Sequence, residues 1–259
     1  MKLKLLAGLA LAAGLATTAG ADTLRVGAYP SNPPWEFKNE QSEFEGFEVE
    51  VIREVAERLG MEVEIEDLGF QALFAATSSG RIDAAISSIT ITNERLQNQS
   101  FTQPYYDAAL VMVTNQDGPD TLDALEGATL GGLAASTGET WIQENTEEYG
   151  FGEYKSYPAQ QGLLLDIVNG RVRAGVSDYL GVAFAAEQMP DLKIAERIRT
   201  GEQYAIMMPK GSELLDDVNA AISAMKEDGT MAALYEEWIG GTPAEGSSTV
   251  TVMDIPQPE

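Results

Sequence analysis

Neither cysteine nor histidine occurs anywhere in the 259 residues of this chain. Without cysteine the chain has no disulfide, no thiolate nucleophile and no thiolate metal ligand. Without histidine it lacks the commonest general base and the commonest transition-metal ligand. Phosphate loops, dinucleotide fingerprints and nucleophile elbows are missing as well. We therefore expect no catalytic residue, no metal and no cofactor.

Basic residues are scarce, with 16 lysines and arginines against 41 aspartates and glutamates and a net charge of −25. A nucleic-acid partner is excluded by that sign. The acidic residues are spread along the chain rather than gathered in a tail, which predicts a solvated acidic surface. A saline habitat and plain solubility would both explain such a surface.

The first 21 residues have the pattern of a secretory signal peptide. Lys2 and Lys4 precede an apolar segment at residues 5–15, and small residues at 19–21 form a cleavage site. The apolar segment is too short to span a bilayer, and no later run approaches that length. We expect cleavage after Ala21, which leaves about 238 residues with 14 basic and 41 acidic side chains, a charge of −27. Because no cysteine follows for a lipid anchor, we expect a protein that diffuses freely in the periplasm.

A 17-residue segment occurs twice without gaps, at residues 71–87 and 161–177. Identical residues at a constant offset include Gln71 and Gln161, Gly80 and Gly170, and Ser87 and Ser177. Each copy has the pattern of a helix, a Gly-Arg break and a short apolar strand. Two copies indicate two similar lobes that face each other in a hinged ligand clamp, although two ordinary helix–strand units could also share this likeness by chance.

Strand and helix patterns alternate along the chain, which favours an α/β fold with mainly parallel central sheets. We expect strands at residues 24–28, 61–65, 84–89 and 129–132 and a helix at residues 47–59 that ends at Gly60. Apolar runs at residues 110–114 and 204–208 are the expected crossings between lobes. They predict a first lobe from residues 22–112 and 206–240, a second lobe from residues 113–205, and a loosely held tail at residues 241–259.

Polar residues follow the repeated strands at the edge where open α/β sheets bind ligands. In the first copy these are Ser87 and Ser88, and then Thr90, with Thr92 as the cap of a helix that carries Arg95 in its first turn. A cation there opposes the helix dipole, and such a broken rule at a strand end indicates function. Arg95 is therefore a candidate for binding a carboxylate through its planar fork, although lone arginines usually lie exposed on the surface.

The second lobe offers two further candidates. Ser136 and Thr137 precede an amphipathic segment, where hydroxyls and free amides at a helix start can bind an anion or simply cap the helix. Asp178 follows the second repeated strand, although aspartate is also common in loops. Arg95 and Asp178 together, one from each lobe, would hold the two ends of a zwitterion. The aromatic rings of Tyr29, Trp35 and Phe70 could wall the same site, and Trp35 could equally belong to the core.

The chain resembles the periplasmic substrate-binding proteins of polar amino-acid ABC importers, a family of solute-binding proteins (family 3) with the type II periplasmic binding fold. The resemblance covers nearly all of residues 24–240, and the segment at residues 80–95 is its most specific part. Its motifs appear in order as LRVG at 24–27, PPWEF at 33–37, GFEVEV at 46–51, GRIDAAISSITITNER at 80–95, FTQPYY at 101–106, NGRV at 169–172 and DGTMAALYEEWIG at 228–240.

The resemblance implies a role for each candidate. Arg95 would bind the ligand α-carboxylate, helped by Thr90 and the Ser88 backbone, with Ser87 in the same cradle. Ser136 and Thr137 would close over the carboxylate, and Asp178 would take the α-ammonium. Phe70 falls where an apolar wall is usual, and Tyr29 and Asn32 fall where side-chain selectivity is often set. Importers of basic amino acids commonly carry an acid at the position of Tyr29, so a neutral or aromatic amino acid is favoured.

The function that this resemblance implies is capture of an amino acid between two lobes and its delivery to an inner-membrane ABC permease, by a monomer that is not an enzyme. One alternative is an enzyme like the cyclohexadienyl dehydratases, which share the scaffold and need an acid over the ligand ring; Glu36 or Glu139 are the candidates. A sensory domain is a third interpretation, but no signalling segment follows the binding module. Relatives of amino acids such as ectoine or an opine stay open as ligands.

Overall fold

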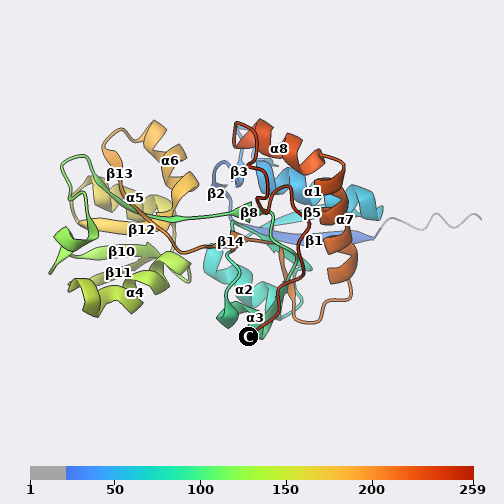
Figure 1. The fold of residues 1–259 in the computed structure, drawn as a ribbon, viewed down its shortest axis with the longest axis horizontal. Helices are drawn as coiled ribbons and strands as arrows, with labels where there is room; N and C mark the ends of the chain where they lie inside the picture. Colours follow the sequence, from blue (N-terminus) through green and yellow to red (C-terminus); the bar gives the residue numbers. More distant parts are fainter. Residues whose placement is uncertain (1–21) are drawn as a thin grey trace, which may run out of the picture.

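A computed structural model of the chain describes residues 22–259, which form two lobes joined by two crossing segments (Figure 1). The predicted signal peptide at residues 1–21 lies outside the described residues. Each lobe contains one five-stranded sheet with helices packed on it, so the expected α/β class is confirmed.

The first lobe is built on a sheet with the strand order β5-β1-β6-β15-β7. Strand β1 pairs in parallel with β5 and β6, whereas β15 is antiparallel to β6 and β7. The strands are β1 (Thr23–Ala28), β5 (Glu62–Asp67), β6 (Ala84–Ile86), β7 (Gln99–Phe101) and β15 (Met207–Pro209). The helices of this lobe are α1 (Phe47–Leu59), α2 (Phe70–Ser78), α3 (Asn93–Asn98), α7 (Leu215–Glu227) and α8 (Thr230–Trp238), and a small sheet is formed by β2 (Ser31–Asn32), β3 (Glu36–Lys38) and β4 (Phe44–Glu45).

The second lobe repeats this plan with the strand order β11-β10-β12-β9-β13. Strand β10 is parallel to β11 and β12, and β9 is antiparallel to β12 and β13, so both sheets are mixed. The strands are β9 (Leu110–Asn115), β10 (Leu130–Leu133), β11 (Tyr154–Tyr157), β12 (Ala174–Asp178) and β13 (Leu192–Ile198). The helices are α4 (Thr137–Tyr149), α5 (Gln160–Val168), α6 (Tyr179–Gln188) and the short 3-10 helix η1 (Leu122–Leu125).

The sequence repeat corresponds to a structural repeat. Helix α2 and strand β6 occupy the same positions in the first copy as α5 and β12 in the second. Both helices end in the same way, because Gly80 and Gly170 adopt left-handed backbone conformations with φ of 71° and 70°. The N–H groups of the arginines that follow, Arg81 and Arg171, each bond back to a helical carbonyl. Strands β6 and β12 also hold the same central place in their sheets, so the two copies are equivalent parts of two lobes with the same plan.

The first crossing between the lobes comes earlier in the chain than the predicted residues 110–114. Strand β9 lies entirely in the second sheet, between β12 and β13, and four of its first five residues are buried without measurable exposure. Its continuous apolar pattern reflects burial on both faces and not a hinge. The crossings instead pair as a two-stranded antiparallel ladder of β8 (Tyr106–Asp107) and β14 (Gln203–Tyr204) in the middle of Figure 1.

The C-terminal segment is packed and not loosely held, which corrects the prediction for residues 241–259. Ser248 and Thr249 are buried, and the Ser248 N–H donates to the Asp107 carboxylate on β8 at 2.9 Å. The buried ammonium of Lys226 donates to the Thr251 carbonyl. The Gly, Pro and Ser content of residues 241–259 suggested a loosely held tail. Partners on α7 and β8 instead hold the segment along the first lobe as far as α3 (Figure 1).

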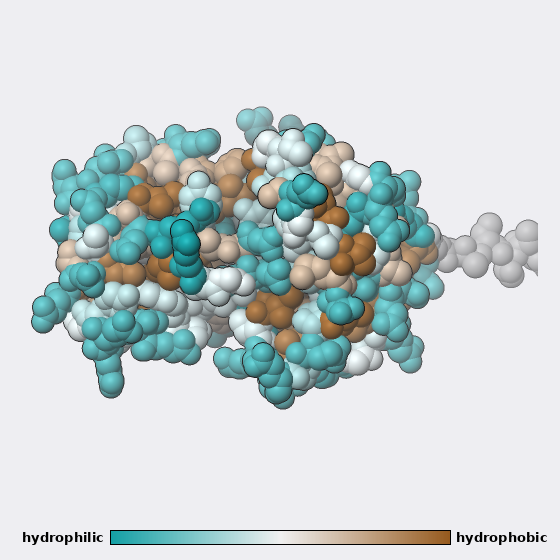
Figure 2. All heavy atoms as spheres, in the orientation of Figure 1, coloured by the Kyte–Doolittle hydropathy of each residue, from teal (hydrophilic) through white to brown (hydrophobic). Residues whose placement is uncertain are grey.

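Hydrophilic residues cover most of both lobes on the face shown in Figure 2, as the acidic composition predicted. Within residues 22–259, no helix is both long and apolar enough to cross a membrane.

Candidate functional site between the lobes

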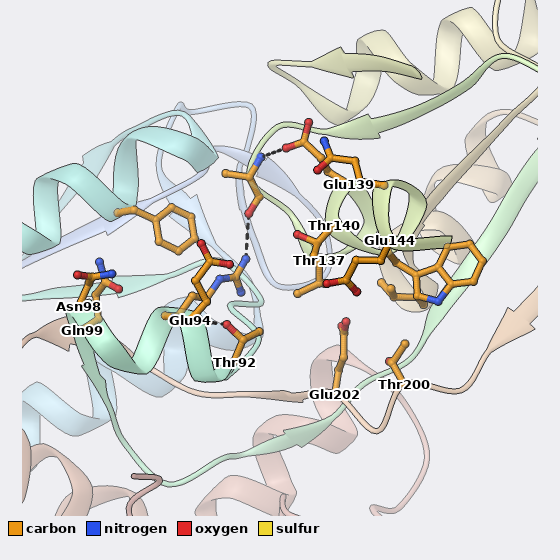
Figure 3. Close-up of a pocket in the computed structure, with 16 residues that line it drawn as sticks. Thr92, Glu94, Asn98, Gln99, Thr137, Glu139, Thr140, Glu144, Thr200 and Glu202 are labelled. Carbon is orange, nitrogen blue, oxygen red and sulfur yellow. Dashed lines mark hydrogen bonds between the residues drawn. The ribbon is translucent and has the colours of Figure 1, made fainter. Parts of the chain in front are cut away.

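Every predicted ligand-binding residue except Trp35 lines one narrow cavity between the lobes. Its volume is about 50 Å³, and it lies beside a wider groove of about 760 Å³ that opens between α3 and α4 (Figure 3). Arg95, Thr137 and Glu202 line both spaces, so the groove leads into the cavity. The predicted residues brought together here are Tyr29, Asn32, Phe70, Ser87, Ser88, Thr90, Arg95, Ser136, Thr137 and Asp178.

Arg95 is held at the junction of the two lobes. Thr92 caps α3 by accepting from the Arg95 N–H at 3.2 Å, which confirms the predicted cap. The guanidinium donates to the Thr90 carbonyl at 2.7 Å and, across the cleft, to the Ala135 carbonyl at 3.0 Å. It also lies 4.9 Å from the centre of the Phe74 ring. Burial lowers the pKa of Arg95 to about 10, so the group still carries its charge at neutral pH.

Ser87 and Ser88 end strand β6 at the cavity. The Ser87 hydroxyl accepts from the Tyr29 N–H at 2.9 Å, which fixes the end of β1 beside it. Ser88 has a φ of 46°, and its N–H donates to both carboxylate oxygens of Glu48 at 3.0 and 2.9 Å. In this arrangement the Ser88 N–H is used by Glu48, whereas the resemblance implied that the Ser88 backbone would help to bind the ligand carboxylate.

Thr90 presents its hydroxyl and its backbone to the cavity. Thr90 and Tyr204 form an isolated antiparallel bridge. The flanking N–H groups of Ile91 and Ala205 donate the hydrogen bonds that hold it. In such a non-hydrogen-bonded antiparallel pair the N–H of Thr90 points away from Tyr204. The Thr90 hydroxyl donates to Glu202 at 3.1 Å.

The start of α4 supplies the second lobe's contribution. Ser136 caps the helix by accepting from the Glu139 N–H at 3.1 Å, and the Glu139 carboxylate accepts from the Ala135 N–H at 2.6 Å. This reciprocal arrangement resembles a capping box and holds Ala135 with a φ of 64°. The sequence left capping and anion binding open for Ser136, and the structure shows that the residue does cap the helix. Thr137 begins the helix and faces the cavity.

Asp178 lies at the end of β12 and caps α6. One carboxylate oxygen accepts from the Tyr204 hydroxyl at 2.7 Å; the other accepts from the Gly181 N–H at 2.7 Å and from Trp35 Nε1 at 3.3 Å. The Leu180 N–H is a further donor to this carboxylate, so protein groups supply donors to most of its lone-pair positions. Burial raises the pKa of Asp178, while its hydrogen bonds oppose that effect.

Trp35 is a core residue and not a pocket wall, which settles the alternative that the sequence left open. Its side chain is fully buried and packs edge-on against Phe47, Tyr106 and Tyr204. Its only polar atom reaches Asp178, so it supports the site from beneath. Tyr29 and Phe70 line the cavity and are each 7% exposed.

Two carboxyl groups lie fully buried under the first lobe's side of the cavity. Glu48 accepts from the Tyr105 hydroxyl at 2.5 Å, and Glu36 accepts from the Asn32 side chain at 3.1 Å. The two carboxyl groups share a side-chain hydrogen bond, in which Glu36 is the protonated partner. Burial and the neighbouring Glu48 raise the pKa of Glu36 well above its usual value. Such a pair holds a proton, because two like charges at close range cannot both be buried.

Neither glutamate proposed for the enzyme alternative is placed over the cavity as an acid. Glu36 is enclosed by Asn32 and the lobe core. Glu139 lines only the outer groove, and its oxygens accept from the Ala135 N–H, Tyr154 and Ser156. Among residues 22–259, no cluster of acidic side chains has the arrangement of a metal site.

Several lining residues were not predicted from the sequence. Glu202 and Tyr204 belong to the return crossing, whose path the sequence pattern did not fix. Gln160 precedes the repeated segment, although its side chain bonds to the repeated Ser177 at 2.8 Å. The repeat itself could have drawn attention to Ser177 as the counterpart of Ser87. The full set of additional residues is Leu110, Leu133, Gly138, Gln160, Ser177, Glu202 and Tyr204.

The molecule has two mixed α/β lobes around a cavity, which an arginine from one lobe and an aspartate from the other both line. This arrangement defines a two-lobed solute-binding protein. Residues 24–241 match the bacterial extracellular solute-binding proteins, family 3, and the chain belongs to this family.

Characterised relatives are binding proteins for amino acids. The chain is 30% identical over 247 residues to the L-cystine-binding protein TcyJ of Escherichia coli strain K12, covering 89% of this chain and 92% of that protein. An ancestral arginine-binding protein bound to arginine is 33% identical with a TM-score of 0.80, covering 84% of this chain and 98% of the other. The ancestral amino acid-binding protein AncCDT-1, a precursor of cyclohexadienyl dehydratase, is 26% identical with a TM-score of 0.74, over 83% and 94% of the chains.

Proposed function

We propose that this protein captures one free amino acid in the cavity between its lobes and delivers it to an inner-membrane ABC permease. The observation that carries this proposal is that Arg95 and Asp178, from opposite lobes, line the same narrow cavity. A zwitterion offers one negative and one positive group, and each would find an opposite charge. Membership of a family whose members bind amino acids in the periplasm supports the same function and location. We propose that the protein acts there as a monomer.

At the carboxylate end of the proposed ligand, Arg95 contributes a positive charge. The Thr90 N–H, the Thr90 and Thr137 hydroxyls and the free amides at the start of α4 add donors. At the ammonium end, Asp178 contributes the negative charge. Ser136 closes the cavity from the second lobe.

The side chain of the ligand would face Tyr29, Phe70 and Leu133, which are mainly apolar lining residues. No carboxylate replaces Tyr29, where importers of basic amino acids commonly carry one. We propose a neutral or aromatic amino acid on this basis.

A thermal-shift screen of the twenty standard L-amino acids and L-cystine tests the function. A ligand at 100 times its Kd stabilises the folded state by about 2.7 kcal/mol, so a true ligand gives a clear rise in Tm. The same screen on Arg95→Ala should show no rise. Arg95→Lys keeps the charge but loses the two-pronged contact, and should bind the same amino acid at least tenfold more weakly in calorimetry. If Arg95→Ala binds as tightly as the wild type, the carboxylate assignment is wrong.

A further inference from the structure

Glu202 is a half-buried acid that the predicted binding scheme does not use. It lies in the return crossing, just before β14, and its carbonyl accepts from the Ala108 N–H at 2.7 Å. The adjacent Gln203 carbonyl accepts from the Ile91 N–H at 2.9 Å. These bonds fix the backbone of the return crossing against the first crossing and against Ile91, which follows β6 in the chain. The side chain extends from there toward Thr137 at the start of α4 (Figure 3).

The carboxylate of Glu202 shares its neighbours with the proposed ligand carboxylate. It accepts from the Thr90 hydroxyl at 3.1 Å, and a hydrogen bond with the Thr137 side chain and the charge of Arg95 also favour its ionised form. Arg95 nevertheless makes no ion pair with Glu202 within 4.0 Å in the described part of the chain. Its guanidinium instead donates to the carbonyls of Thr90 and Ala135.

We propose that Glu202 is an internal stand-in for the ligand carboxylate. Before the ligand binds, the Glu202 carboxylate accepts from the Thr90 and Thr137 hydroxyls, and it lowers affinity until the ligand displaces it. This inference rests on the proposed function, because it requires an amino-acid carboxylate at Arg95. Two carboxylates cannot share these donors without repulsion, so the ligand carboxylate must turn the hydroxyls away from Glu202. Glu202 thereby sets how tightly the clamp holds its ligand and how readily it releases it.

The titratable groups around the cavity predict how ligand affinity changes with pH. Burial raises the pKa of Glu202, so protonation in mild acid removes the competing charge and tightens binding. The charged or titratable groups that face Glu202 or line its groove are Arg95 and Glu94 on α3, Asp178 before α6, Tyr204 on β14, and Glu139 and Glu144 on α4. Protonation of Asp178 acts in the opposite sense, because it weakens the hold on the ammonium group. Comparing Glu202→Gln with the wild type at each pH isolates the Glu202 contribution.

The test is calorimetry on wild type, Glu202→Gln and a matched control, Glu144→Gln, with the twenty standard L-amino acids and L-cystine as individual probes. Glu144 lines the same groove and is exposed, so its variant makes the same charge change away from Thr90. At pH 7 we expect Glu202→Gln to bind about tenfold more tightly than wild type, a change of about 1.4 kcal/mol, and Glu144→Gln to bind within twofold of it. The advantage of Glu202→Gln should shrink as the pH falls toward the raised pKa of Glu202.

Unchanged or weaker binding by Glu202→Gln would overturn the stand-in role. Weaker binding confined to L-arginine, L-lysine and L-ornithine, the last added as a further probe, would identify Glu202 as a partner for a cationic side chain instead. If none of the probes binds to either wild type or Glu202→Gln, both the stand-in role and the proposed amino-acid function are overturned. If the wild type binds and the two affinities are equal, only the stand-in role fails.

Discussion

At the scale of single residues, the buried carboxyl pair of Glu36 and Glu48 gives a direct prediction about stability. The folded pKa of Glu36 lies well above the unfolded value of 4.5, because burial and the Glu48 charge disfavour ionisation. Its contribution to stability is therefore most favourable below pH 4.5 and is lost as the pH rises toward the folded pKa. Within that window each pH unit changes the contribution by about 1.4 kcal/mol.

Glu36→Gln mimics the neutral acid and should gain stability relative to wild type as the pH rises from 4.5 to 8. Urea unfolding at a series of pH values measures this difference. Glu40→Gln removes the same charge from an exposed position in the adjacent turn and should show little such trend. A Glu36→Gln difference that is constant or falls with pH would mean that Glu36 does not hold a proton in the folded protein.

The residues that the sequence identified in the site share a recognisable local context. Arg95 and Asp178 each follow a strand of the repeat, and the carboxyl ends of such strands converge at one edge of a sheet. Glu202 and Tyr204 had no comparable signal, because they reach the cavity only through the path of the return crossing. Trp35 was ambiguous, since an aromatic ring beside prolines suits a wall as well as a core.

At the scale of secondary-structure elements, the close packing of α4 against β12 holds one side of the cavity. Gly138 permits this contact, because a Cβ atom there would lie 2.3 Å from the Val176 carbonyl oxygen. The backbone oxygen cannot move aside cheaply, so a larger residue would push the start of α4 away from the end of β12. Ser136 and Thr137 would then move relative to Asp178.

Gly138→Ala should therefore cost about 1–3 kcal/mol of stability and weaken amino-acid binding. Gly162→Ala is the matched control in the first turn of α5, where the nearest atom, Tyr157 Cδ1, would lie at 3.5 Å. It should stabilise the protein by about 0.5–1 kcal/mol, and the first repeat copy already carries Ala72 at this position. Chemical unfolding and calorimetry measure both effects, and equal behaviour of the two variants would contradict this account of Gly138.

Element boundaries were predictable where local chemistry decides them. Helix α1 begins and ends at the predicted residues, because its apolar spacing is regular and Gly60 adopts the left-handed conformation that ends it. The position of β9 was not predictable, since an apolar run is compatible with a crossing strand and with the centre of a sheet. The tail was misjudged for a related reason: its order depends on partners such as Asp107 that are distant in the sequence.

At the scale of the whole molecule, side chains from both lobes hold the cleft in its narrow form. Gln161 on α5 accepts from the Tyr29 hydroxyl at 3.0 Å and donates to the Ser31 carbonyl at 3.0 Å. Both partners belong to the first lobe. A ligand that contacts both lobes binds the closed arrangement best, so bonds that favour closure raise its apparent affinity.

Gln161→Ala should weaken amino-acid binding by roughly two- to tenfold, as expected for losing partly exposed neutral hydrogen bonds. Small-angle scattering should also show a larger radius of gyration for the ligand-free variant than for wild type, with compaction when ligand is added. Gln71→Ala changes the equivalent residue of the first repeat copy, which is exposed on α2, and should have no effect on either measurement. Identical radii for the Gln161 and Gln71 variants would argue against closure by this contact.

The central claim is that the cleft recognises a zwitterion through Arg95 and Asp178, and one double-mutant cycle tests it most directly. Wild type and Asp178→Asn are each titrated with the amino acid found in the screen and with its des-amino analogue. Asparagine keeps an oxygen for the Gly181 N–H, so the cap of α6 is largely retained. We expect the substitution to weaken amino-acid binding by roughly 30-fold to several-thousand-fold, as for a buried charge left unpaired, and to affect the analogue far less. Equal losses for the two ligands would contradict the claim and show that Asp178 only holds the lobe together.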